Sequence, residues 1–131
     1  MENLFIEPTS KTPLVDFKSN GQLKISGNSY PENVIEFYEP LLKWIDEVLK
    51  SKVISISISL ELKYINTNFI KFILTLIKKI NNNTKVSINV TWLYEIDDED
   101  IYDTGRDIEE LTNIKFEFLE KDFVEPVKIF V

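Results

Sequence analysis

Residues 53–62, "VISISISLEL", alternate strictly between apolar and polar side chains. The apolar positions share one face of an extended strand: Ile54, Ile56, Ile58, Leu60 and Leu62. The polar positions share the other face: Ser55, Ser57, Ser59 and Glu61. Because a strand covered by helices on both sides is apolar almost throughout, this alternation predicts a sheet with only one covered face. We therefore expect the apolar set to be buried and the serines to lie on an open face.

Four further segments show the same alternation. Residues 13–18 and 22–26 flank Ser19-Asn20-Gly21, which is typical of a β-hairpin. Residues 85–92 and 114–118 alternate further along the chain. The sequence therefore predicts a sheet of about five strands that begins with an antiparallel hairpin.

Three segments between these strands have helical spacing of their apolar residues. Two are expected at about 67–81 and about 98–112. The other follows "SYPEN", where Ser29 and Glu32 have the spacing of a capping box. Pro40 lies inside that third pattern, so we expect a kink or two helical pieces there.

The order of these elements predicts an α/β fold in two layers. Strand–helix–strand connections are almost always right-handed, so helices on one face require strands that step across the sheet in one direction. Strands 53–62, 85–92 and 114–118 should therefore be parallel neighbours, with three main helices largely on one face. A chain of 131 residues is expected to form a single domain, residues 1–131.

This topology places the start of each helix at the edge where the parallel strands end. Tyr64–Thr67 and Glu95–Asp100 are then adjacent connections on one rim of the sheet. Functional residues of open α/β sheets tend to lie at this rim.

Composition excludes several classes of function. The chain has no cysteine and no histidine, which removes thiolate chemistry, imidazole catalysis and imidazole metal ligands. Its net charge of −7 disfavours binding to nucleic acid and to anionic lipid. With no signal peptide and no apolar run long enough to span a membrane, we expect a cytoplasmic protein without cofactors whose partners are other proteins.

The segment "YINTNFIKFIL", residues 64–74, contains a threonine at the expected start of a helix. In one interpretation the Thr67 hydroxyl only satisfies a free amide of the first turn. In the other it is a phosphorylation site, because a phosphate there would meet free amides and the positive end of the helix dipole. The two interpretations are compatible.

The segment "YEIDDEDIYDTG", residues 94–105, is strongly acidic. Asp97, Asp98, Asp100 and Asp103 are hard oxygen ligands, so a metal-dependent hydrolase built on the Asp97–Asp100 cluster is one alternative. The spacing is not that of an EF-hand, and acidic residues at a helix start usually match the helix dipole. We therefore favour a structural role for these residues. No glycine-rich nucleotide loop occurs.

Several segments in order along the chain resemble the SiaC family of bacterial regulatory phosphoproteins. They are "TPLVDF" (12–17), "LKISG" (23–27), "SYPEN" (29–33), "EFYEPLLKW" (36–44), "YINT" (64–67) and "YEIDDEDIYDTG" (94–105). The resemblance implies a fold similar to STAS domains, the anti-sigma-factor antagonists. It also implies a partner-switching adaptor rather than an enzyme.

In that family a dedicated kinase phosphorylates one threonine and a PP2C-type phosphatase removes the phosphate. The unmodified form binds and activates a downstream protein, in the best-known systems a diguanylate cyclase that makes cyclic di-GMP. The resemblance leaves one alternative open, an anti-sigma-factor antagonist in the strict STAS sense, which differs only in its partner.

The family's threonine lies in an "NTSS"-type motif and falls on Thr67, with Asn66, Ile70 and Lys71 also matching. Asn68 and Phe69 replace the two serines, so Thr67 is the sole hydroxyl acceptor within the motif. We expect the partner to contact the rim around it: Tyr64, Asn66, Asn68, Phe69, Lys71, Asp97, Asp98 and Asp100.

Overall fold

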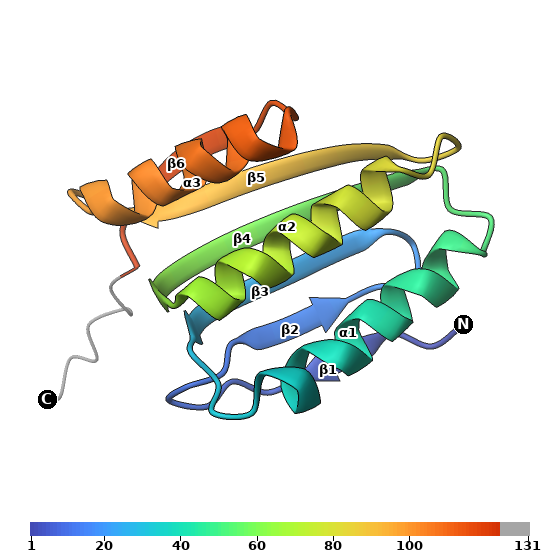
Figure 1. Cartoon of the computed structure of the whole chain (residues 1–131), viewed down its shortest axis with the longest axis horizontal. Coiled ribbons are helices and arrows are strands. Elements are labelled where there is room, and N and C mark those ends of the chain that lie inside the picture. Colours follow the sequence, from blue (N-terminus) through green and yellow to red (C-terminus); the bar gives the residue numbers. More distant parts are fainter. Residues whose placement is uncertain (124–131) are drawn as a thin grey trace, which may run out of the picture.

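The computed structural model describes residues 1–123 and shows three helices on one face of a six-stranded sheet (Figure 1). The strands, which follow one another across the sheet in chain order, are β1 (Leu4–Ile6), β2 (Leu14–Phe17), β3 (Gln22–Ser29), β4 (Ser55–Ile65), β5 (Ser87–Glu95) and β6 (Glu117–Lys121). The helices are α1 (Val34–Leu49), α2 (Thr67–Asn81) and α3 (Glu99–Thr112).

The strand directions follow the expected scheme. The pairs β1–β2 and β2–β3 are antiparallel, whereas β3, β4, β5 and β6 are parallel neighbours. The sequence missed β1, because its three residues are too few to show an alternation. The strands expected at 85–92 and 114–118 begin two and three residues later. A turn closed by Asn83 takes up the first positions of the former, and the Phe116 amide of the latter donates to Glu109 Oε2 rather than to a neighbouring strand.

Strand β4 has the expected division between its two faces. Ile56, Ile58, Leu60 and Leu62 are buried, whereas Ser57 is exposed and its neighbouring serines are half-buried. Ile54 is an exception, because its side chain is 76% exposed. It precedes the first residue of β4 and lies outside the regular part of the strand, so the alternation does not apply to it.

The start of α1 differs from the capping box that the sequence suggested. Asn33 caps the helix, and its side chain accepts a hydrogen bond from the Glu36 amide at 3.0 Å. Ser29 instead remains in β3, because it pairs with Ile65 of β4 and its carbonyl accepts from the Asn66 amide at 3.2 Å. Pro40 lies within one continuous helix rather than between two helical pieces.

Helix α3 packs very closely on β5. The Trp92 side chain is fully buried, and its Nε1 donates to the Ile101 carbonyl at 3.0 Å. A Cβ atom at Gly105 would lie 2.5 Å from Trp92 Nε1, so only glycine allows this approach. This contact fixes the start of α3, and hence the acidic connection before it, against the end of β5.

Within residues 1–123, no helix has both the length and the apolar character needed to cross a lipid bilayer.

Candidate functional site

Three connections meet at the edge where β3, β4 and β5 end (Figure 1). Glu61 of β4 is in register with Leu93 of β5, and both strands end within four residues of that pair. Ser29 at the end of β3 is aligned with Ile65 at the end of β4. The connections that contain Thr67 and the acidic residues are therefore adjacent, as expected from right-handed crossovers.

Asn66, not Thr67, caps α2. Its Oδ1 accepts a hydrogen bond from the Phe69 amide at 3.0 Å, and its backbone is extended. Thr67 is the first residue of the helix and is exposed, and its hydroxyl makes no hydrogen bond within residues 1–123. Thr67 therefore does not cap α2, although the sequence was compatible with that role.

Replacing the cap should measurably destabilise the domain. We expect Asn66→Ala to lower the free energy of unfolding by about 1 kcal/mol, since the Phe69 amide loses its acceptor. Asn68→Ala is the control, because Asn68 is exposed and its loss should change stability by less than about 0.5 kcal/mol. Urea denaturation measures both, and equal changes would rule out capping by Asn66.

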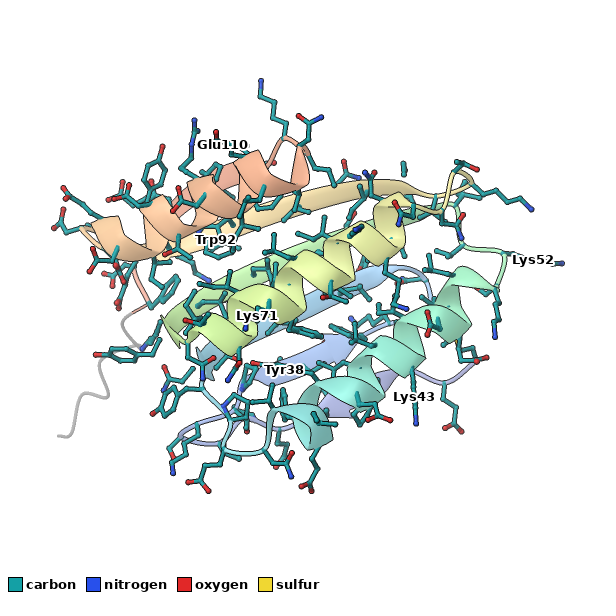
Figure 2. The ribbon with its side chains drawn as sticks, in the orientation of Figure 1. Tyr38, Lys43, Lys52, Lys71, Trp92 and Glu110 are labelled. Carbon is teal, nitrogen blue, oxygen red and sulfur yellow. The ribbon has the colours of Figure 1, made fainter. Side chains whose placement is uncertain are left out.

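Phe69 was expected at the partner-binding rim, but its side chain is fully buried. With the cap at Asn66, position 69 points into the core, where its ring lies 6.4 Å from that of Tyr38 on α1 and 6.2 Å from that of Phe72 on α2. The same helix phase leaves Asn68 and Lys71 exposed, and Tyr64 near the end of β4 is exposed as well. Figure 2 shows Lys71 near the start of α2.

The acidic connection has mainly structural roles. Asp98 caps α3 by accepting from the Ile101 amide at 3.1 Å, and Glu99 and Asp100 occupy the first turn, where they match the helix dipole. Asp97 adopts a left-handed conformation with φ of 67°, which aspartate tolerates better than most residues. Within residues 1–123 no group of three or more acidic side chains is placed so that it could hold a metal ion.

Pattern analysis missed a buried polar contact beneath the rim. The Ser29 and Tyr38 hydroxyl oxygens lie 2.9 Å apart in a buried hydrogen bond, and the Tyr38 ring stacks on Phe72 at 4.3 Å. Burial raises the pKa of Tyr38 above its usual range, so the hydroxyl stays protonated. This hydrogen bond connects α1 to the end of β3, next to Asn66. The spacing of apolar residues in the sequence does not predict it.

Pattern analysis also missed two apolar side chains on the connections. Tyr30 is 37% exposed and Ile96 is 52% exposed, immediately after β3 and β5. For Ile96 the available signal was its position between Glu95 and Asp97, whereas Tyr30 lies between Ser29 and Pro31 and had no such signal.

Comparisons with known proteins give a consistent result. The family profile described as "SiaC family regulatory phosphoprotein" matches residues 6–121. An uncharacterized protein of Pseudomonas aeruginosa strain UCBPP-PA14 is 27% identical over 121 residues, which cover 88% of this chain and 94% of that protein.

Solved structures from Pseudomonas aeruginosa have the same fold. A chain in the crystal structure of diguanylate cyclase SiaD with its activator SiaC superposes with a TM-score of 0.82 at 23% identity, covering 90% of this chain and 99% of that one. The crystal structure of apo-SiaC gives a TM-score of 0.74 at 25% identity, covering 92% of this chain and 99% of that one.

Proposed function

The chain belongs to the SiaC family of regulatory phosphoproteins, and we propose that it is a non-enzymatic adaptor whose partner choice is set by phosphorylation of Thr67. One observation carries the assignment of the residue. Asn66 performs the capping that a threonine at a helix start usually performs, which leaves the exposed Thr67 hydroxyl free to be modified.

The surroundings of Thr67 suit a phosphate. The first turn of α2 contains no acidic side chain, and its free amides and the helix dipole favour a negative group. The neighbouring helices differ, since the first turn of α1 contains Glu36 and that of α3 contains Glu99 and Asp100. The folded domain is therefore expected to accept the modification without rearranging.

The proposal includes three partners in the bacterial cytoplasm. A dedicated protein kinase adds the phosphate, a PP2C-type phosphatase removes it, and the unmodified form binds and activates a downstream effector. A diguanylate cyclase is the effector we favour, because SiaC from Pseudomonas aeruginosa is named as the activator of diguanylate cyclase SiaD and has the same fold. The acidic net charge of −7 agrees with protein partners rather than nucleic acid.

The proposed contact surface is the rim around Thr67. The exposed members point outward and are available to a partner: Tyr64, Asn68, Lys71, Asp97 and Asp100. Asn66 and Asp98 are half-buried caps, so they act by fixing the two connections. Phe69 supports the rim from the core.

The test is a pull-down from the native cell with Thr67→Ala and Thr67→Asp baits, together with mass spectrometry of the protein isolated from that cell. We expect phosphate on the peptide that contains Thr67 and an effector held more strongly by Thr67→Ala. Recovery of an anti-sigma factor instead of a cyclase would favour the strict STAS alternative. Absence of phosphate from Thr67 under all growth conditions would contradict the proposal.

A further inference from the structure

Three exposed apolar side chains lie at the ends of the adjacent strands β3, β4 and β5, and we call them the apolar rim: Tyr30, Tyr64 and Ile96, exposed by 37%, 69% and 52%. Glu61 and Leu93 are the last paired residues of β4 and β5, and Tyr64 and Ile96 each lie three residues beyond that pair, at the same edge of the sheet. The register of Ser29 with Ile65 likewise places Tyr30 beside Asn66. Exposed apolar groups that gather in this way mark interaction surfaces.

A single cationic side chain borders this surface on α2. Lys71 is four residues after Thr67, and side chains at this spacing are neighbours on a helix surface. Helical side chains also lean toward the helix N-terminus, so Lys71 extends over the turn that begins at Thr67. Lys71 is exposed and forms no ion pair within residues 1–123, unlike Lys79, whose Nζ lies 2.8 Å from Asp46.

The acidic connection lies on the opposite side of the apolar rim. Asp97, Glu99 and Asp100 are exposed and form no ion pair within residues 1–123. A partner that brings a carboxylate to this surface would therefore be attracted on the α2 side and repelled on the α3 side. Such a charge pattern fixes the orientation of docking as well as its strength.

We propose that the apolar rim and Lys71 form the docking surface for the effector, which presents apolar side chains next to a carboxylate that pairs with Lys71. This inference rests on the proposed function and specifies how it is regulated. A phosphate on Thr67 pairs with Lys71 within the chain, at the favourable spacing of four residues. The effector's carboxylate then loses its cation and faces a dianion, so Lys71 exchanges one partner for the other.

Binding measurements test the surface. The probe is the effector retained by the unmodified protein from the native cell, purified and titrated by calorimetry. We expect Tyr64→Ala and Lys71→Ala each to weaken binding about tenfold or more, and Lys71→Arg to retain most of it.

Matched controls come from the far end of the helices. Leu111 is 70% exposed near the end of α3, and Lys78 is exposed near the end of α2. Leu111→Ala and Lys78→Ala should change affinity less than about twofold. If the rim variants bind as well as these controls while phosphorylation of Thr67 still releases the effector, the docking surface is wrong and the proposed function stands.

Phosphorus NMR tests the exchange without the effector. In protein phosphorylated at Thr67, the Lys71 ammonium should lower the second pKa of the phosphate below its ordinary value of about 6. Lys71→Ala should raise that pKa again, whereas Lys78→Ala should leave it unchanged. The same pKa in all three proteins would overturn the exchange of partners by Lys71.

Discussion

Phosphorylation of Thr67 is expected to weaken the effector's binding by about a hundredfold or more. The phosphate adds roughly −1.5 to −2 charges at neutral pH to a residue that lies exposed at the rim. An effector that packs an apolar or acidic surface over this position must desolvate the dianion, which costs several kcal/mol. Because each 1.4 kcal/mol corresponds to about tenfold in affinity, the loss is large.

The fold itself should change little on phosphorylation. The amides at the start of α2 and the Lys71 ammonium attract the phosphate, whereas Asp97, Glu99 and Asp100 at the start of α3 repel it. These effects oppose each other in the free energy of unfolding, so the melting temperature should shift only slightly. A kinase or phosphatase must bind the phosphate, so its affinity need not fall.

The measurement compares chemically phosphorylated with unmodified protein, by calorimetric titration of the effector and by thermal melts. Thr67→Ala should bind like the unmodified form, and Thr67→Asp should weaken binding only partly, since a carboxylate has less charge than a phosphate. Equal affinities would remove the switch. If the melts show that the phosphate unfolds the domain, the loss of effector binding would be caused by destabilisation and not by altered recognition.

The strand and helix order was predictable because long regular patterns are set by burial. The alternation over residues 53–62 requires one buried face, and right-handed connections then fix the order of the parallel strands. The same rules brought the Thr67 connection next to the acidic connection. Local sequence patterns predict an element correctly where one of its faces is buried along its whole length.

The errors arose where tertiary contacts override a local pattern. Ser29 has the spacing of a helix cap, but pairing with β4 keeps it in β3 and leaves Asn33 to cap α1. Phe69 replaces a family serine, and its spacing from Phe72 and Ile73 allowed either a core position or an exposed one. The Asn66 cap fixes the start of α2, and the side chain lies in the core. Tyr30 and Ile96 belong to no periodic segment, so their exposure follows from the shape of the rim alone.

A large loss of stability is expected for Ile56→Ala on β4. Ile56 is fully buried on a strand that has β3 on one side and β5 on the other, and it pairs with Ile88. Truncation removes buried methyl groups and leaves a cavity in a sheet that cannot relax easily, which costs about 2–5 kcal/mol. Domains of this size have total stabilities of about 5–15 kcal/mol, so the variant would keep only part of its stability.

Ser57→Ala is the matched control for Ile56→Ala, because the next residue of the same strand points to the open face. Ser57 is exposed and its side chain makes no hydrogen bond within residues 1–123, so its replacement should change stability by less than about 0.5 kcal/mol. Urea denaturation at unchanged m-value measures both free energies.

Ile56 is nine residues before Ile65, about 30 Å along the strand, so the folded fraction should bind the effector normally. Similar losses in the two variants would mean that helices cover both faces of β4, and the two-layer architecture that brings Thr67 to the rim would then be wrong.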